Sequence, residues 1–337
     1  MEHETRGPAR KVLMTGRVLV TGGGGFIGSH LSEHLLQRGY RVRVLDNFAT
    51  GRRENVSGIA GDAELIEGDV QSYQRVEKAV SGCEVILHQA ALPSVQRSIH
   101  DPLTSNATNV IGTLNVLLAA RDQGVRRVVC ASSSSVYGSA SGVAPKRETD
   151  ATVPISPYAT GKLAGELYAR SFHGVFGLDV VALRYFNVFG PRQDPSSQYS
   201  AVIPKLIAAL TAGRRPVIFG DGEQSRDFTY VENVVRANAL AMDAPGVAGQ
   251  IYNVACGERV TVNRLVRETE DLLGVEIEPV YTAPRPGDVR HSVADLSRAR
   301  RELGYEPTVR LREGLARTIH YGSGLEEAGP VRRVVRA

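Results

Sequence analysis

Cysteine, methionine and tryptophan are scarce in this chain of 337 residues, which has three cysteines, three methionines and no tryptophan. Cys83, Cys130 and Cys256 lie far apart in the sequence, which excludes a dense disulfide framework and argues against a cysteine-based metal site. We therefore expect reduced thiols, no bound metal and a cytoplasmic location.

Long apolar runs are also missing. No stretch approaches the roughly 18 apolar residues of a membrane span, and the charged N-terminus lacks the apolar core of a secretory signal. Only five of the 40 basic residues are lysines, and no lysine-rich tract with interleaved aromatic residues occurs. These absences argue against binding to membranes or to nucleic acids. The formal net charge of +4 instead suits an anionic small substrate.

The first half of the chain alternates short apolar runs with helical patterns. The expected strands are Arg17–Val20, Arg41–Leu45, Glu64–Glu67, Glu84–Gln89, Arg127–Ala131 and Asp179–Arg184. Apolar residues recur at helical spacing over Phe26–Arg38, Asn106–Arg121 and Tyr158–Val175. Strands separated by helices indicate an α/β fold class with a Rossmann-type, doubly wound parallel sheet.

The regular alternation fades after residue 185, where prolines and glycines interrupt the chain. We expect helices over 201–211, 231–243, 262–273 and 311–320. The expected organisation is a Rossmann domain over 15–185 with return segments near 230–256. A smaller mixed α/β C-terminal lobe then covers mainly 186–322, with tails at 1–14 and 323–337.

A glycine-rich turn follows the first expected strand. Gly22, Gly25 and Gly28 are spaced by three residues, and Phe26 and Ile27 begin the helix that follows. Such glycines permit a tight turn, the approach of a pyrophosphate and close packing of the helix on the strand. The helix N-terminus would then face the phosphates with its unpaired N–H groups. An ordinary turn is the alternative in a chain with 35 glycines, but the position between strand and helix favours dinucleotide binding.

Asp46 ends the second expected strand. A carboxylate at this position accepts hydrogen bonds from the two hydroxyl groups of an adenosine ribose and repels a 2′-phosphate, which favours NAD over NADP. Arg52 and Arg53 would favour NADP, but we interpret them as solvated loop charges. Asp69 and Val70 follow the third expected strand and suit the adenine edge, although a turn explains Asp69 equally well.

Tyr158 and Lys162 are four residues apart in an expected helix, which places a phenol and an ammonium on one face. A phenol with a pKa of about 10 is a poor base at neutral pH, and a neighbouring ammonium favours its ionised form. Ser133 follows the fifth expected strand and could hydrogen-bond the reacting oxygen. These three residues are the candidate catalytic set for removing a proton from a substrate hydroxyl group. The alternatives are an exposed helix pair for Tyr158 and Lys162 and a serine-rich turn for Ser133.

Together these stretches resemble the extended short-chain dehydrogenase/reductases, specifically the nucleotide-sugar 4-epimerases of the UDP-galactose 4-epimerase type. The likeness covers about residues 15–322. The matching stretches are Thr21–His30, Asp46–Phe48, Gly68–Val70, His88–Ala91, Asn109, Ser132–Gly138, Tyr158–Lys162, Arg184–Pro191, Arg226–Phe228 and Arg285–Asp288.

This resemblance implies roles for individual residues. It makes Ser133, Tyr158 and Lys162 catalytic. It implies an NAD site formed by Gly22, Gly25, Phe26, Ile27, Asp46, Asn47, Asp69, Val70, Gln89, Ala90, Ala91, Asn109, Tyr158, Lys162 and Tyr185. It implies a UDP-sugar site formed by Ser133, Asn187, Gln193, Ala201, Val202, Arg226, Arg285, Asp288 and Ser292. The two arginines would grip the diphosphate, because paired phosphates need planar, permanently charged partners.

The resemblance implies oxidation of the sugar at C4 by bound NAD, rotation of the 4-keto sugar and return of hydride to its opposite face. The related 4,6-dehydratases carry an Asp-Glu pair where this chain has Ser134 and Ser135, and the related decarboxylases usually carry a Glu at the second position. Two hydroxyl groups cannot supply an acid and a base, which favours simple epimerisation. An NAD-bound scaffold without activity would need to have lost the tyrosine or the lysine, and both are present.

Substrate choice depends on residues near the sugar. In the epimerase pattern the residue four after Asp288 gates the 2-position of the sugar, and the small Ser292 leaves room there. Gln193 and its surroundings look like epimerases that prefer UDP-N-acetylhexosamines, whereas Pro93 departs from the glycine often found in them. We expect UDP-N-acetylglucosamine and UDP-N-acetylgalactosamine as substrates, with UDP-glucose and UDP-galactose as the alternative and UDP-glucuronate less favoured. The resemblance also implies a homodimer that pairs through helices at about 100–122 and 158–175.

Overall fold

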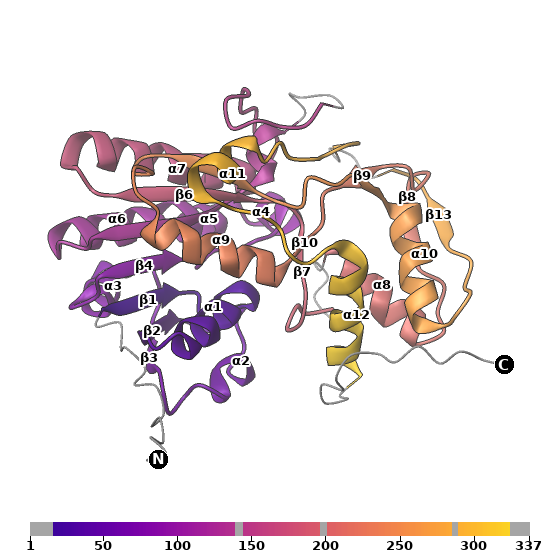
Figure 1. Cartoon of the computed structure of the whole chain (residues 1–337), viewed down its shortest axis with the longest axis horizontal. Coiled ribbons are helices and arrows are strands. Elements are labelled where there is room, and N and C mark those ends of the chain that lie inside the picture. Colours follow the sequence, from indigo (N-terminus) through magenta and orange to yellow (C-terminus); the bar gives the residue numbers. More distant parts are fainter. Residues whose placement is uncertain (1–15, 139–143, 196–200, 285–288, 324–337) are drawn as a thin grey trace, which may run out of the picture.

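The computed structural model describes residues 16–138, 144–195, 201–284 and 289–323, whose arrangement is shown in Figure 1. Its centre is a seven-stranded sheet with the order β11-β6-β5-β4-β1-β2-β3, in which all neighbouring strands are parallel. Its strands are β1 (Arg17–Thr21), β2 (Arg41–Asp46), β3 (Glu64–Glu67), β4 (Val85–His88), β5 (Arg127–Ser133), β6 (Val180–Tyr185) and β11 (Ile251–Val254). The predicted doubly wound parallel sheet is confirmed.

Helices cover both faces of this sheet (Figure 1). One face carries α1 (Phe26–Gln37), α9 (Val231–Asp243) and α11 (Ser297–Leu303). The other face carries α3 (Tyr73–Val80), α6 (Gly112–Asp122) and α7 (Pro157–Phe176). Two-sided coverage explains why the central strands read as continuous apolar runs in the sequence.

The residues of β1 alternate between two hydrophobic cores. Val18 and Val20 pack into the core beneath α1 and α9, whereas Leu19 packs into the core beneath α3 and α6. Successive side chains of a strand point to opposite faces, so a single strand serves both cores. All three side chains are at most 1% exposed, and burying each stabilises the fold by roughly 1.5–3 kcal/mol.

Strand order reverses at β1, which lies between β4 and β2. In sheets of this type, ligands bind beyond the carboxyl ends of the strands at such a reversal. The glycine-rich turn leaves β1 at this point, and the loop after β4 lies beside it because the two strands are paired. The topology therefore places both candidate cofactor segments at one edge of the sheet.

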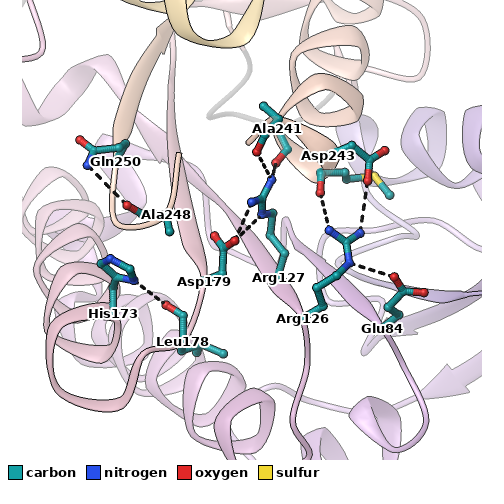
Figure 2. Close-up of polar contacts among 12 residues, drawn as sticks. Glu84, Arg126, Arg127, His173, Leu178, Asp179, Ala241, Asp243, Ala248 and Gln250 are labelled. Atoms are coloured by element: carbon teal, nitrogen blue, oxygen red, sulfur yellow. Dashed lines mark hydrogen bonds and ion pairs between the residues drawn. The ribbon is translucent and has the colours of Figure 1, made fainter. Parts of the chain in front are cut away.

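Two consecutive arginines at the start of β5 tie the sheet to the end of α9 (Figure 2). Arg127, whose side chain is 7% exposed, pairs with Asp179 at 2.6 Å and donates to two carbonyl oxygens at the end of α9 at 2.9 and 2.7 Å. Arg126 contacts Glu84 at 2.8 Å and Asp243 at 3.2 Å, but its side chain is 43% exposed. Cations at the C-terminus of a helix satisfy carbonyl groups that have no partner within the helix.

A smaller lobe lies beside the sheet (Figure 1). It has its own hydrophobic core. Its helices are α8 (Val202–Thr211), α10 (Val262–Leu273) and α12 (Leu311–Gly322). Three short strand pairs join β7 (Val188–Phe189) to β10 (Thr229–Tyr230), β8 (Val217–Phe219) to β13 (Val280–Thr282), and β9 (Ser225–Arg226) to β12 (Val260–Thr261). The predicted mixed α/β lobe is thus present.

The predicted single helix over Asn106–Arg121 is wrong in its details. The chain forms α5 (Pro102–Asn106), a π-helical turn (Ala107–Ile111) and then α6. Asn109, inside the π turn, accepts from the Leu92 N–H at 2.8 Å and donates to the Leu92 carbonyl oxygen at 3.2 Å. A π turn widens the helix by one residue, commonly at a functional site, and here it directs the Asn109 amide to a neighbouring loop.

Four further helices of the described residues were not expected, namely α2 (Glu54–Ser57), α3, α4 (Val95–His100) and α11. A short 3₁₀ turn also follows β5 over Ser134–Tyr137. Among the described helices, none combines the length and the apolar character needed to cross a membrane. The described residues contain no cluster of three or more histidine, cysteine or acidic side chains suited to a metal ion, and all three cysteines are buried free thiols.

Candidate active site

The glycine-rich turn forms a cradle that only glycine permits. Gly22 adopts a φ of +70°, and a Cβ placed on it would lie 2.6 Å from the backbone nitrogen of Ala90. A Cβ on Gly28 would lie 2.1 Å from the Gly22 carbonyl oxygen, so α1 packs directly on the turn. No side chain caps α1 at Gly25, which leaves the first-turn N–H groups of Phe26 and Ile27 at the helix end where anions bind. These residues fit the pyrophosphate of a dinucleotide.

Asp46 lies beside this cradle at the end of β2. Its Oδ2 accepts from the Gly24 N–H at 2.8 Å, and its Oδ1 accepts from the Phe48 N–H at 2.7 Å. Burial raises the pKa of the carboxyl group, although these backbone hydrogen bonds oppose the rise. The carboxylate is therefore fixed next to the glycine turn. This is the position expected of a group that accepts hydrogen bonds from ribose hydroxyl groups.

The neighbouring predicted cofactor residues form a connected edge. Asn47 donates to Asp69 at 2.7 Å, and Asp69 also accepts from the backbone N–H of Gln71 at 2.8 Å. Val70 is buried against Gly112 of α6. Asp69 therefore stabilises a turn, which is the alternative role given in the sequence analysis. It also contacts Asn47, another predicted cofactor residue.

Arg52 and Arg53 are solvated, as the sequence interpretation expected, and each also has an acidic partner. Arg53 pairs with Glu67 at 2.7 Å, and Arg52 pairs with Asp194 at 2.7 Å. Both side chains are more than half exposed, but each has an acidic partner.

A hydrogen-bond chain fixes the loop after β4. The Ala90 N–H donates to Thr21 Oγ1 at 3.3 Å, and Thr21 Oγ1 lies 2.7 Å from His88 Nδ1. On the other side, His88 Nε2 lies 3.0 Å from Thr113 Oγ1, which donates to the Asn109 carbonyl oxygen at 2.7 Å. Since the Thr113 hydroxyl donates onward, we assign the proton of His88 to Nε2, so Nδ1 accepts from Thr21.

Gln89 and Tyr185 meet on the other side of the same loop. The Tyr185 hydroxyl lies 3.2 Å from Gln89 Oε1 and 2.8 Å from Asn238 Nδ2 of α9. Burial raises the pKa of Tyr185 well above its ordinary value, so its hydroxyl stays protonated and can donate. The structure thus brings Gln89, Ala90, Ala91, Asn109 and Tyr185 together around the ends of β4 and β6.

Ser133, Tyr158 and Lys162 converge where β5 ends and α7 begins. Ser156 caps α7 by accepting from the Ala159 N–H at 3.2 Å, and Pro157 occupies its first turn, where a missing N–H has no cost. The backbone N–H of Tyr158 donates to Ser98 of α4 at 3.0 Å. These contacts set the start of α7 and therefore the direction of its first turns.

The electrostatics of this trio are dominated by burial. Burial raises the pKa of the Tyr158 phenol, and the side-chain hydrogen bond with Ser133 opposes the rise. Burial lowers the pKa of Lys162 to about 8, while Cys130 and Glu166 oppose the fall. Lys162 Nζ donates to the Ala131 carbonyl oxygen at 2.8 Å. The ammonium is therefore held by the backbone of β5 and keeps two further N–H donors.

The predicted substrate residues are spread along the smaller lobe. Asn187, with a φ of +32°, donates to the Asp227 carbonyl oxygen at 3.1 Å. Gln193 donates to the Val188 carbonyl oxygen at 3.2 Å, and its buried Oε1 has no partner among the described residues. Arg226 donates to the Ser225 carbonyl oxygen at 2.9 Å.

Other predicted substrate residues flank these positions. Ser292 is buried, and its backbone N–H donates to the Ser225 carbonyl oxygen at 3.1 Å. Ser225 is the neighbour of Arg226 in β9, so Ser292 lies close to Arg226. Ala201 directly precedes α8 and Val202 begins it, and both are exposed. Arg285 and Asp288 lie outside the described residues.

The loop that leads into the smaller lobe is docked on α1 and on the loop after β2. Arg192 pairs with Glu33 of α1 at 2.5 Å, and the Pro191 carbonyl oxygen lies 3.0 Å from His30 Nε2. The Arg52–Asp194 ion pair adds a third contact. Sequence reasoning missed these links because they join residues more than 140 positions apart.

The fold and the glycine cradle define a Rossmann-type protein with a dinucleotide site at the carboxyl edge of its sheet. The model of the NAD dependent epimerase/dehydratase family matches residues 18–255. This chain belongs to that family, and its cofactor is NAD. The resemblance inferred from the sequence motifs is thereby confirmed.

Individual relatives cover nearly the whole chain. A UDP-glucose 4-epimerase of Mycolicibacterium smegmatis is 40% identical, with 90% of this chain and 98% of the relative covered. The structure of a UDP-N-acetylglucosamine 4-epimerase from Methanobrevibacter ruminantium in complex with UDP-N-acetylmuramic acid is 40% identical, with a TM-score of 0.88 and coverage of 92% and 99%. A UDP-glucose 4-epimerase of Thermus thermophilus in complex with NAD is 37% identical, with a TM-score of 0.84 and coverage of 91% and 99%.

Proposed function

We propose that this protein is an NAD-dependent UDP-sugar 4-epimerase whose substrates are UDP-N-acetylglucosamine and UDP-N-acetylgalactosamine. The observation that carries the proposal is the convergence of Ser133, Tyr158 and Lys162 at the end of β5, beside the NAD cradle. The relatives named above are 4-epimerases of UDP-sugars, which supports the reaction class.

The chain's own residues supply the proton chemistry. Tyr158 is the proposed base that takes a proton from the C4 hydroxyl group, and Ser133 hydrogen-bonds the same oxygen and opposes the rise that burial causes in the pKa of the phenol. Lys162 supplies a positive charge and two free donors on the cofactor side. NAD, when bound at the glycine cradle, would supply the hydride chemistry at C4 of the sugar.

The residues after Ser133 support epimerisation over elimination of water. Ser133 Oγ donates to Ser135 Oγ at 3.0 Å and accepts from the Ser135 N–H at 3.1 Å. Hydroxyl groups occupy the positions of Ser134 and Ser135, and neither titrates near neutral pH, so this turn offers no acid–base pair for elimination.

The choice of UDP-N-acetylhexosamine rests on Ser292 and Gln193. Ser292 is small and held by the backbone of β9, and the buried Oε1 of Gln193 is available to accept a hydrogen bond from the sugar. UDP-glucose and UDP-galactose are the alternative substrates, and the UDP-glucose 4-epimerase relatives support them.

Product analysis with the NAD-loaded protein tests this proposal. We expect C4 epimers from UDP-N-acetylglucosamine, less product from UDP-glucose, and least from UDP-glucuronate, each resolved by chromatography. Tyr158→Phe should lower kcat by roughly 10²-fold or more with NAD still bound, whereas Tyr168→Phe, a change of the same kind on the same helix, should not. Release of free NADH during turnover would rule out an epimerase.

We further propose that two copies pair through α4, α5 and α7. Leu103 is 82% exposed, Leu167 is 56% exposed and Ile99 is 54% exposed. The three helices that carry them pack together on one side of the sheet. A surface with several large exposed apolar side chains is typical of an interface between subunits.

A further inference from the structure

A buried ion pair lies directly behind the proposed catalytic residues. Glu166 of α7 accepts from Arg184 Nε at 2.8 Å and from Arg184 Nη2 at 2.7 Å, and the two side chains are 1% and 3% exposed. Glu166 Oε1 also accepts from Ser132 Oγ at 2.5 Å. These contacts connect α7, β6 and β5 at a single carboxylate.

Each member of this cluster is adjacent to a predicted site residue. Ser132 precedes Ser133 on β5, and Arg184 precedes Tyr185 on the neighbouring β6, where the register pairs Ser132 with Arg184. On α7, Glu166 follows Lys162 by four residues, which is one helical turn on the same side. The cluster therefore borders the proposed site on β5, on β6 and on α7.

Stability alone gives little reason for this ion pair. Removing two charges from water costs several kcal/mol per ion, and well-packed apolar residues in the same place are often equally stabilising. A buried carboxylate in this position is better explained by the charge that it places next to another buried ion, the Lys162 ammonium.

Three titratable groups from the surrounding elements act on Lys162, namely His88 of β4, Cys130 of β5 and Glu166. Burial lowers the pKa of His88 to about 3 and raises the pKa of Cys130 to about 12, so both are neutral near pH 7. Glu166 is thus the anion among the three. Arg184 packs on Glu166 from β6 and partly neutralises it.

We propose that Glu166 is a positioning residue for catalysis: it keeps Lys162 charged and, through Ser132, holds Ser133 in register with α7. This inference rests on the roles proposed above for Lys162 and Ser133. Glu166 itself contacts neither sugar nor nicotinamide in this account, and acts through its neighbours.

The test is the pH profile of the NAD-loaded enzyme. Because an opposite charge nearby shifts a pKa by about one unit or more, Glu166→Gln should move the alkaline limb of kcat/KM to lower pH by about one unit. The alkaline limb of NAD affinity, measured by titration of the cofactor-free protein, should move by the same amount. A lost structural contact would lower activity at every pH and would leave the limb in place.

Glu148→Gln is the matched control. Glu148 lines the same 410 Å³ cavity as Glu166, but its carboxylate accepts from the Asn253 N–H at 2.8 Å, away from Lys162. We expect its alkaline limb to coincide with that of the wild type. If the limb of Glu166→Gln also coincides with the wild type in both measurements, the effect on Lys162 is disproved.

A second pair of variants covers the possibility that Glu166→Gln does not fold, since it leaves Arg184 buried without its partner. Ser132→Ala removes one hydrogen bond and no charge. Its kcat/KM should fall several-fold, while the alkaline limb of its pH profile should stay at the wild-type pH. Ser132→Thr should restore kcat/KM. Full activity in Ser132→Ala would refute the register role. Absence of epimerase activity in the wild type would refute the proposed function, while the NAD-affinity profile would still decide on Glu166.

Discussion

Lys162 Nζ lies 2.8 Å from the carbonyl oxygen of Ala131, so the proposed catalytic lysine of α7 is anchored to the backbone of β5. Ala131 precedes Ser133 by two residues on that strand. This hydrogen bond therefore links the helix that carries the proposed base to the strand that carries its serine partner, and it leaves two ammonium donors for a ligand.

Replacement of Lys162 by Met should remove both the anchor and the charge. We expect kcat to fall by roughly 10²- to 10⁴-fold, the scale of a lost acid–base contribution, together with weaker NAD binding. Steady-state kinetics and NAD titration measure the two effects. Lys78→Met, an exposed lysine of α3, is the control, and equal behaviour of the two variants would contradict the assignment.

Ser292 should control the size of the sugar. A tyrosine at this buried position would overfill the space, and overpacking costs roughly 1–3 kcal/mol. We expect Ser292→Tyr to lower kcat/KM for UDP-N-acetylglucosamine by about 10- to 100-fold and to leave UDP-glucose conversion largely intact. Ser292→Ala should keep both activities. Equal losses for both sugars would show that Ser292 has no gating role.

The consecutive arginines of Figure 2 should differ sharply in their contribution to stability. Arg127→Met removes a buried guanidinium from Asp179 and from the end of α9, and should lower the free energy of unfolding by roughly 3–5 kcal/mol. Arg126→Met removes a half-exposed guanidinium and should cost less than about 1 kcal/mol. Urea denaturation of both variants measures the two free energies of unfolding. Similar losses in the two variants would refute this prediction.

His88 should make the protein sensitive to acid. Burial lowers its pKa from 6.5 to about 3, so below pH 6.5 the unfolded chain binds a proton that the folded protein does not. The destabilising effect of His88 on the folded protein is therefore absent above pH 6.5 and grows as the pH falls towards 3. Between about pH 7.5 and 5.5, the wild type should lose about 1.4 kcal/mol more unfolding free energy than His88→Gln.

The control for that experiment is His100, an exposed histidine at the end of α4. His100→Gln should show the same pH dependence as the wild type in denaturation curves. If His88→Gln also follows the wild-type curve, His88 is already protonated in the folded protein and the neutral hydrogen-bond chain is wrong.

The proposed dimer surface can be tested by placing charged side chains on it. Leu103→Glu combined with Leu167→Glu should halve the molecular mass measured by light scattering, because two carboxylates per subunit would be buried unpaired in the interface. Leu65→Glu changes an exposed leucine of β3 at the opposite edge of the sheet and should leave the mass unchanged. A wild-type protein with the mass of a single chain would refute the dimer.

Local patterns in the sequence were sufficient for most of the fold. The strand Glu64–Glu67 and the helices Val231–Asp243 and Val262–Leu273 have the predicted bounds, because apolar periodicity and clear end signals coincide there. The π turn at Asn109 could not be predicted, since its cause is a pair of hydrogen bonds to Leu92, seventeen positions away.

The candidate site shows the same limit. Four-residue spacing predicted that Tyr158 and Lys162 share a face, and extending it by one further step would have found Glu166. No local signal could show that Glu166 pairs with Arg184 or that Lys162 reaches Ala131, because both partners come from other strands of the sheet.

The position of β11 in the sheet has a consequence for biosynthesis. This strand forms the outer edge beside β6, yet the chain reaches it only after passing through much of the smaller lobe. A nascent chain that stops short of Val254 would expose the backbone edge of β6, which is a template for aggregation. The two lobes therefore cannot be produced as separate polypeptides by cutting the chain once between them.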